Sequence, residues 1–411
     1  MIEWSEQHQM IRDAVRRFIE AEVEPNLEEL EHGDTPPYDV LRKLLATFGM
    51  DEMARTRFEK QIAREKAGEQ EKRGSDGEGA AAGRGDAAAM QLIPIIELCR
   101  FCPGMVTAMG VSMGLTAGAI MSKGTTRQKE RWGLALLTME QIGSWAITEP
   151  GSGSDAFGSM KSTARRDGEG GYVLNGSKTF ITTGPYADVI VFICKLEEAG
   201  VDPRDRKVLT FVLEKGMDGL TQSKPMRKMG LHSSPTGELF LQDVRVGTDR
   251  LLGETEHSPA RSGAKDSFSL ERTGVAAMAL GIVERCLELS LAYARERVQF
   301  GRPIGEFQLI QDKLARMEVA RMNVQNLVFR QIELAGAGRG PTFAEASAMK
   351  LYSARAAMEV ALEAVQIHGG NGYMAEYQVE QLCRDAKVLQ IYAGTDEIQI
   401  SAIARDLLAS A

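Results

Sequence analysis

The chain has 411 residues, of which 43% are hydrophobic and 26% are charged, as in a soluble globular protein. Its 49 Lys and Arg against 57 Asp and Glu give a net charge of −8, which argues against a general nucleic-acid or anionic-membrane binder. No apolar run approaches the roughly 20 residues that span a bilayer, and the N-terminus lacks the basic start and apolar core of a signal peptide. A chain of this length should form more than one domain.

Five cysteines, an odd number, are spread along the chain. Their spacing predicts reduced thiols in a cytoplasmic protein rather than a disulfide framework. Cys99 and Cys102 have C-x-x-C spacing, but a structural zinc site needs a second such pair or matched histidines, and the sequence offers neither. We therefore expect no metal site and interpret these two residues as thiols on a helix.

The first part of the chain, residues 1–141, is predicted to be a helical domain. Residues 5–24 and 38–48 carry apolar side chains at helical spacing. Pro25 cannot continue a helix and therefore ends the first of them.

Residues 51–89 interrupt this pattern. A charge-dense run is followed by a stretch, 74–85, that is rich in glycine and almost free of bulky apolar groups. Such a composition cannot offset the cost of ordering the chain. We predict a solvated helix extension followed by a flexible loop, with a partner-binding or lid role as the alternative.

Helix is predicted again over residues 90–139. Met105–Ser122 is apolar nearly all round and is expected to be buried in the protein rather than in a membrane. Thr125–Gln128 fits a capping box at the start of a further helix.

Residues 142–250 are predicted to form a β-domain, because short apolar runs alternate there with Gly and Pro turns. The strand candidates are 144–148, 172–178, 180–184, 189–194, 208–213 and 239–246. Asn175-Gly176 is the strongest short-range hairpin signal in the chain.

Residues 251–411 are predicted to be helical after a polar loop over 254–266. The predicted helices are 267–298, 308–336, 342–367, 377–391 and 396–409, and such long helices suggest a bundle. The fold class is therefore mainly α with a middle β-domain.

Three stretches carry local chemical signals. Thr148–Asp155 (TEPGSGSD) offers Ser hydroxyls and glycines whose backbone can approach a polar ligand, although a G-x-G spacing alone is weak. Arg295–Ile304 reads on its own as a solvated helix end. Arg384–Gln399 reads as a helix–turn–helix joint in which Gly394 permits φ > 0 and Thr395 can cap the next helix.

Together with Gln366–Tyr373 (QIHGGNGY), these stretches closely resemble the signatures of the acyl-CoA dehydrogenase family. The resemblance covers nearly the whole chain apart from residues 51–89. It implies an N-terminal helical domain, a small β-barrel-like domain and a C-terminal four-helix bundle. It also implies FAD as cofactor, an acyl-CoA substrate and a homotetramer built as a dimer of dimers.

The resemblance assigns roles residue by residue. The FAD contacts of the β-domain would be Trp145, Ile147, Thr148, Gly153, Ser154, Phe180 and Thr182, with Phe180 beside the isoalloxazine where many relatives have Trp. Those reaching the FAD of a neighbouring subunit would be Arg297, Gln299, Phe300, Gln366, Gly369 and Gly370. Thr395 and Glu397 would also contact FAD, and Ser154, Arg272, Tyr392 and Gly394 would contact the substrate.

The catalytic base is displaced in this sequence. Many family members carry the base as a glutamate where this chain has Ala393. In the isovaleryl-CoA and long-chain branches it lies instead on the first long helix after the β-domain, in an L-E-R pattern that matches Leu270-Glu271-Arg272. Glu271 is therefore the predicted base, although an acidic residue near a helix start is common. The backbone N–H of Ala393 would still hold the thioester oxygen.

The predicted function is FAD-dependent α,β-dehydrogenation of an acyl-CoA to the trans-2-enoyl-CoA, with an electron-transfer flavoprotein as acceptor. One alternative is an acyl-CoA oxidase or flavin monooxygenase relative that uses oxygen. Another is a non-catalytic or nucleic-acid-associated family member. The acyl chain length is not predicted, and His368, beside a glycine turn, is interpreted as structural rather than as a base.

Overall fold

The computed structural model describes residues 3–68, 78–257 and 260–410. It is mainly helical with a mixed β-sheet in the middle of the chain, as predicted. The N-terminal helices are α1 (Glu6–Glu22), α2 (Leu27–His32), α3 (Tyr38–Thr47), α4 (Met50–Lys66), α5 (Glu78–Cys99), α6 (Pro103–Met109), α7 (Gly118–Lys123), α8 (Thr126–Gln128) and α9 (Leu134–Leu137). The predicted capping box at Thr125 and Gln128 is present.

Part of the flexible loop predicted within residues 51–89 is helical instead. α4 is the predicted helix extension, and α5 begins inside the glycine-rich stretch. Alanine-rich sequence has high helix propensity and outweighs the interspersed glycines, and Arg84 Nη2 fixes the helix by donating to Gly336 O at 3.1 Å. Residues 69–73 of the predicted helix extension and residues 74–77 of the predicted loop lie outside the described residues.

The apolar helix of the N-terminal part is longer than predicted. Within the described chain, Pro103–Lys123 is a 21-residue helix with mean hydropathy 1.4, long and apolar enough to cross a membrane by length and composition alone. The prediction that no apolar run is long enough to span a bilayer was therefore wrong. However, 61% of this apolar stretch is buried inside the protein, as in the core helix of a soluble domain. Its middle, Gly110–Ala117, is wound as a π-helix.

The strands of the sheet are β1 (Gly143–Ala146), β2 (Thr163–Arg166), β3 (Tyr172–Thr182), β4 (Val189–Leu196), β5 (Val208–Glu214), β6 (Leu220–Gln222) and β7 (Thr236–Val246). Most of the predicted strands are present, but the candidates 172–178 and 180–184 form one strand, and β2 and β6 were not predicted. Neighbouring strands run β1-β4-β2-β3-β7-β6, with β5 also paired to β4. The β1–β4 and β2–β4 pairs are parallel and the other pairs are antiparallel.

The hairpin predicted at Asn175-Gly176 is wrong, because β3 runs straight through these residues. The register against β7 shifts between Leu174 and Gly176, which marks a β-bulge. Gly176 has φ +151°, and a Cβ there would lie 2.2 Å from Ser162 Oγ. Asn175 bonds across the bulge, with Asp243 N donating to its Oδ1 at 2.8 Å. Asn175 and Gly176, which usually form a hairpin turn, form a β-bulge within a continuous strand here.

The C-terminal helices are α10 (Ala260–Glu296), α11 (Gln308–Gly336), α12 (Phe343–His368), α13 (Val379–Val388) and α14 (Asp396–Ser410), and the short strands β8 (Val298–Gln299) and β9 (Arg302–Pro303) join α10 to α11. α10 begins before the predicted residue 267, so the polar loop predicted over 254–266 was too long. Residues 258–259 of that loop lie outside the described chain.

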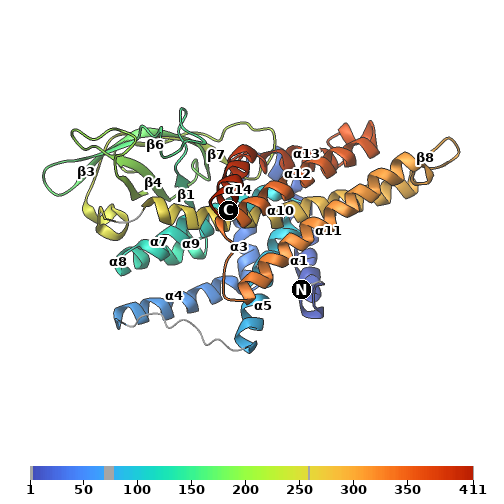
Figure 1. Ribbon diagram of the computed structural model, residues 1–411, viewed down its shortest axis with the longest axis horizontal. Helices are drawn as coiled ribbons and strands as arrows, with labels where there is room; N and C mark the ends of the chain where they lie inside the picture. The colour runs from blue at the N-terminus through green and yellow to red at the C-terminus, as the bar shows by residue number, and fades with distance from the viewer. Residues whose placement is uncertain (1–2, 69–77, 258–259, 411) are drawn as a thin grey trace.

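The helices before and after the sheet share one apolar core. Buried side chains of α1, α3, α5 and α6 pack with those of α10, α11, α12 and α13 in a single cluster. A second cluster lies within the sheet, and a third joins β1, β4 and β5 to the region of α7 and α9. Figure 1 shows the sheet at one end of the molecule and the β8 turn at the other, with α10, α11 and α12 between them. The division at residues 141/142 and 250/251 remains our proposal.

A buried carboxylate joins this core, and its removal should weaken the fold. Glu97 is fully buried and pairs with Arg12 Nε at 2.5 Å, Arg16 Nε at 2.7 Å and Arg100 Nε at 3.3 Å. Glu97→Gln should lower the free energy of unfolding by about 3 kcal/mol, because buried arginines lose their compensating charge. Urea unfolding measures this. Asp39→Asn, which breaks the exposed Arg42 pair, should cost less than about 1 kcal/mol; equal effects would contradict the prediction.

Candidate functional site

Glu271 lies near the start of α10 and is half-buried. Burial raises the pKa of its carboxyl from 4.5 to about 7, although the positive charges of Arg272 and Lys350 act in the opposite direction. Among the described residues no hydrogen-bond donor reaches its carboxylate oxygens. A carboxylate in this state is suited to take up a proton near neutral pH.

Arg272 is buried, and in the described structure its hydrogen bonds and its ring contact are with residues of α12 and of the turn before α14. Its Nη1 donates to Ser347 Oγ at 2.8 Å, and its Nε lies 3.4 Å from Ala393 O. Its guanidinium also sits 4.0 Å from the ring centre of Phe343. Arg272 therefore joins α10 to α12 and to the turn before α14.

That turn has an unusual backbone. Ala393 and Gly394 are consecutive residues with positive φ, +52° and +87°. The left-handed region is unfavourable for alanine, and such residues persist where the surroundings hold them. In the part of the chain that the structure describes, the N–H groups of Ala393 and Gly394 donate to no acceptor, whereas both carbonyl oxygens accept hydrogen bonds. Thr395 Oγ1 accepts from Ile398 N at 3.4 Å, as expected of a helix cap.

Two residues that sequence reasoning missed hold these carbonyls. Lys350 of α12 donates from Nζ to Gly394 O at 2.8 Å. Gln399 of α14 donates from Nε2 to Ala393 O at 2.9 Å and to Gly394 O at 2.7 Å. Burial lowers the pKa of Lys350 to about 8, against the opposing effect of Asp396. A lysine within a run of alanine and methionine on a buried helix was the available signal.

Tyr392 and Glu397 flank the turn. Tyr392 is half-buried, its hydroxyl lies 3.3 Å from Met278 Sδ, and burial raises its pKa above the usual range. Glu397 is exposed in the first turn of α14. Tyr392 thus turns toward the core beside α10, whereas Glu397 turns outward.

The β-domain meets this region through the loop before β7. Leu231 N donates to the buried carboxylate of Asp385 at 2.6 Å, and Arg384 Nη1 donates to Met229 O at 3.0 Å. Gly230 is pressed so closely against α13 that a Cβ would lie 2.7 Å from the backbone of Arg384. This joint fixes the sheet against the helix that leads into the Tyr392 turn.

The predicted flavin residues of the β-domain lie at the end of β1 and in the following loop. Trp145 is buried on β1, Ile147 and Thr148 are half-buried, and Gly153 and Ser154 are exposed. The loop is held from below by Glu149, which pairs with buried Lys178 at 2.9 Å and accepts from Lys161 N and Ser162 N. The loop backbone is therefore anchored while its tip is open.

Phe180 stands out from β3 because of a second irregularity in that strand. The pairing with β7 shifts between Lys178 and Ile181, and Phe180 has φ +57°. Bulges redirect side chains, and the ring of Phe180 is 66% exposed. Thr182, two residues further on, is half-buried. An exposed ring held by strained backbone is suited to cover a flat ligand.

These residues fit a flavin on local grounds. Trp145 Nε1 is buried and has no hydrogen-bond partner within the described residues. Gly151 and Gly153 have no atom within 4 Å of where a Cβ would stand, so the loop leaves room for a ligand to approach its backbone. An unsatisfied donor, an open glycine loop and an exposed ring are the features that such a cofactor would use.

The second set of predicted FAD residues gathers at the other end of α10 and α12. Arg297, Gln299, Gln366, Gly369 and Gly370 are exposed, and Phe300 is 94% exposed. The two segments lie together, because Tyr293 stacks on His368 at 4.3 Å and accepts from Asn371 Nδ2 at 3.1 Å. His368 is buried and bonds Ala364 O, in keeping with a structural role. Figure 1 shows this end far from the sheet.

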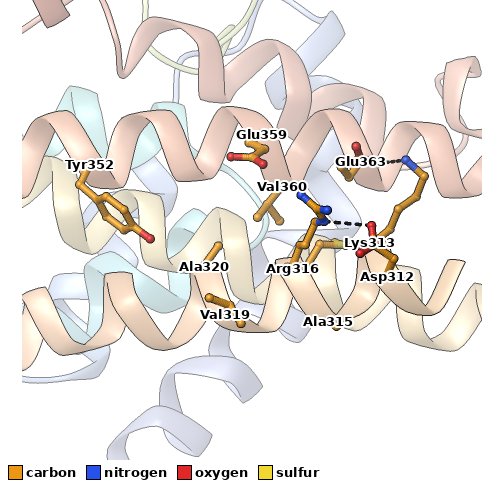
Figure 2. A pocket seen from close by; sticks show the side chains of 11 residues that line it. Asp312, Lys313, Ala315, Arg316, Val319, Ala320, Tyr352, Glu359, Val360 and Glu363 are labelled. Carbon is orange, nitrogen blue, oxygen red and sulfur yellow. Dashed lines mark hydrogen bonds and ion pairs between the residues drawn. The ribbon is translucent and has the colours of Figure 1, made fainter. Parts of the chain in front are cut away.

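Two further features do not belong to this site. Within the described chain no group of three His, Cys, Asp or Glu side chains could hold a metal ion. A groove of about 440 Å³ lies between α11 and α12, with Val319, Ala320 and Val360 among its apolar residues and with the Arg316–Asp312 ion pair at 2.9 Å. Figure 2 shows the side chains that line it, which come from both helices. It contains none of the predicted site residues.

Comparison with known proteins identifies the family. Models for the N-terminal, middle and C-terminal domains of acyl-CoA dehydrogenase match residues 5–54 and 45–140, 144–244, and 262–408. An acyl-CoA dehydrogenase of Bacillus subtilis is 36% identical over 97% of both chains. A 3-(aryl)acrylate reductase of Clostridium sporogenes is 33% identical over 98% of this chain and 99% of its own. The chain belongs to the acyl-CoA dehydrogenase family.

Solved structures agree with this result. Butyryl-CoA dehydrogenase of Megasphaera elsdenii has a TM-score of 0.81 at 32% identity and covers 99% of this chain and 100% of its own. An acyl-CoA dehydrogenase of Bacillus anthracis in complex with FAD has a TM-score of 0.80 at 30% identity and covers 99% of this chain and 68% of its own. The protein is therefore an FAD-containing oxidoreductase that acts on acyl-CoA.

The raised pKa of Glu271 predicts a pH-dependent effect on stability. Its folded-state pKa of about 7 lies above the usual 4.5, so its favourable contribution is complete below about pH 4.5 and is lost as the pH rises through about 7. Glu271→Gln should therefore raise the thermal midpoint at pH 8, and the difference should shrink toward pH 5. Thermal unfolding from pH 5 to 8 tests this. Glu296→Gln, which removes a carboxylate from the exposed end of the same helix, is the control. A Glu271→Gln variant less stable than the wild type at pH 8 would refute the prediction.

Proposed function

We propose that the protein removes the α-proton and β-hydride of an acyl-CoA thioester to give the trans-2-enoyl-CoA, with Glu271 as the base. The observation that carries this proposal is the pairing of two groups. A carboxylate with a raised pKa and no hydrogen-bond donor in the described structure lies beside a turn whose N–H groups are directed to no protein acceptor. Ala393, within that turn, cannot take a proton.

Each residue then has a role that follows from its chemistry. Bound FAD, which Trp145, Thr148 and Phe180 would hold, would supply the two-electron acceptor for the hydride that leaves Cβ. Glu271 takes the α-proton, and the Ala393 N–H donates to the thioester oxygen, on which negative charge develops as the C–H bond breaks. Arg272 holds the turn against α10 by its contact with Ala393 O. Tyr392 and Gly394 line the substrate side of the same turn, and Ser154 reaches the substrate from the flavin loop.

The direction of electron flow allows a second candidate. The Clostridium sporogenes relative carries the name of a reductase, and the same residues could return a proton to Cα of an unsaturated substrate. We favour the oxidative direction because the Bacillus subtilis and Megasphaera elsdenii relatives carry the name of dehydrogenases. Anaerobic mixing of the oxidised enzyme with saturated thioesters, and of the dithionite-reduced enzyme with 2-enoyl thioesters, followed by flavin absorbance, compares the rates of the two directions.

We further propose an electron-transfer flavoprotein as the acceptor, which is the carrier that family resemblance implies. Hydrogen peroxide formed without an added acceptor would instead support the oxidase or monooxygenase alternative. Absence of flavin bleaching by any acyl-CoA under anaerobic conditions would support the non-catalytic alternative. A panel of acyl-CoAs of different length and branching would also identify the substrate.

We propose a homotetramer, a dimer of dimers. The two sets of predicted FAD residues lie at opposite ends of the folded molecule (Figure 1). One FAD can therefore contact both sets only where two copies of the chain meet. The exposed Leu309, Val319 and Met322 of α11 give the bundle apolar surface suited to a further copy. The groove of Figure 2 lies on the same helix and adds charged side chains to that surface.

Replacing the base tests the central proposal. FAD-loaded Glu271→Gln should lose at least about 10³-fold in the rate of anaerobic flavin reduction, because the amide cannot accept the α-proton. Its FAD content and its affinity for the enoyl-CoA product should stay close to those of the wild type. Glu296→Gln serves as the control for a carboxylate lost from the same helix. Near-normal turnover of Glu271→Gln with the best substrate would disprove the assignment.

Mixing two defective chains tests whether a site is shared between subunits. Arg297→Ala should bind FAD weakly and Glu271→Gln should be inactive, each as a pure oligomer. In a mixed oligomer, one site combines the Glu271 of one chain with the intact Arg297 of the other. Co-expression should therefore restore up to about one quarter of wild-type activity for random pairing, as expected for separate defects in a shared site. Activity no higher than the mean of the two pure variants would show that each chain completes its own site.

A further inference from the structure

The Ala393–Gly394 turn is held by side chains from two other helices. We propose that Lys350 and Gln399 are positioning residues, whose hydrogen bonds to the carbonyls of this turn keep the Ala393 N–H directed at the thioester oxygen. The inference rests on the proposed function, because it assumes that this turn receives the thioester.

Lys350 is fully buried on α12, where a charged side chain is costly unless it is paired and hydrogen-bonded. Its Nζ has two partners in the described structure, and both belong to this region. It donates to Gly394 O at 2.8 Å and lies 3.8 Å from Asp396 Oδ1 at the start of α14. Because burying an ammonium group is costly, its hydrogen bond to the Gly394 carbonyl indicates that this carbonyl must be held in place.

Gln399 approaches the same turn from α14. It is buried, and its Nε2 donates to Ala393 O at 2.9 Å and to Gly394 O at 2.7 Å. The Nε of Arg272 adds a longer contact of 3.4 Å to Ala393 O. Two adjacent carbonyls therefore take donors from α10, α12 and α14.

These bonds bear on the N–H because of the backbone conformation. Ala393 has φ +52°, which an alanine leaves readily unless it is held. Rotation about φ changes the angle between the Tyr392–Ala393 peptide, which carries the N–H, and the peptide that follows. Fixing the two following carbonyls fixes that angle. Releasing them allows φ to return to negative values and turns the N–H away.

A purely structural role for Lys350 would be to neutralise Asp396. That role can be separated, because Arg355 Nε pairs with the other oxygen of the same carboxylate at 2.9 Å and touches neither turn carbonyl. Arg355→Met therefore removes a cation from Asp396 while leaving intact the hydrogen bonds of Lys350 and Gln399 to the turn carbonyls. It is the matched control for Lys350→Met. Gln399→Met removes the hydrogen bonds of Gln399 to the turn carbonyls with little change in side-chain volume.

The test uses FAD-loaded protein and a readout other than turnover. 4-(Dimethylamino)cinnamoyl-CoA, an aromatic enoyl thioester, shifts its absorption to longer wavelength when its carbonyl is polarised by donors. Wild type, Glu271→Gln and Arg355→Met should all show the shift on binding. Lys350→Met and Gln399→Met should lose at least half of it, and kcat should fall about tenfold or more while KM changes less than about threefold. Lys350→Gln, which keeps a donor without the charge, should recover part of both.

The outcomes distinguish this inference from the function on which it rests. A full shift in both Lys350→Met and Gln399→Met would overturn the positioning role and leave the proposed function intact. No shift in the wild type would overturn both, since the turn would not hold the thioester. A shift that persists in Glu271→Gln together with full turnover would refute only the base. If Lys350→Met fails to bind FAD or to fold, Gln399→Met decides the question alone.

Discussion

The proposed catalytic region depends on one constraint, the left-handed conformation of Ala393 and Gly394. An alanine in this conformation is unfavourable by roughly 1–2 kcal/mol, and it persists because Lys350, Gln399 and Arg272 hold the two carbonyls. These three donors come from α12, α14 and α10. The conformation of this short turn therefore depends on how the helices of the bundle pack. A shift of any of the three helices would move a donor and change the turn.

The same arrangement explains how Glu271 keeps a raised pKa beside two cations. Arg272 donates to Ser347 Oγ and Ala393 O, and its guanidinium lies over the ring of Phe343. Lys350 donates to Gly394 O. Neither donates to Glu271 in the described structure. Their charges lower the pKa of the carboxyl only from a distance, so that desolvation prevails and the value stays at about 7. A direct salt bridge would have produced a permanently ionised and weakly basic carboxylate.

Much of this could be predicted from the sequence, and the failures share a cause. Helix periods and caps placed α1, α3, α11 and α12 to within a residue or two, because these signals are local. The Asn-Gly signal failed because pairing with β7 turned it into a bulge, and the glycine-rich loop failed because alanine propensity and the Arg84 contact favoured helix. Lys350 and Gln399 were also missed. Lys350 contacts a residue 44 positions away, which no local pattern records. Gln399 contacts residues only five and six positions away, but these contacts depend on a left-handed conformation that alanine rarely adopts.

The fold also explains why a base can occupy either of two places in the chain. Arg272, the residue after Glu271, touches Ala393, so the start of α10 and the turn before α14 are spatial neighbours despite their separation of 121 residues. A carboxylate from either element can therefore serve the same substrate atom. Two at once would share a buried pocket, where like charges raise one pKa strongly and couple the two titrations. With Glu271 as the proposed base, a small side chain at 393 avoids this repulsion, and Ala393 keeps the backbone N–H that we propose for the thioester oxygen.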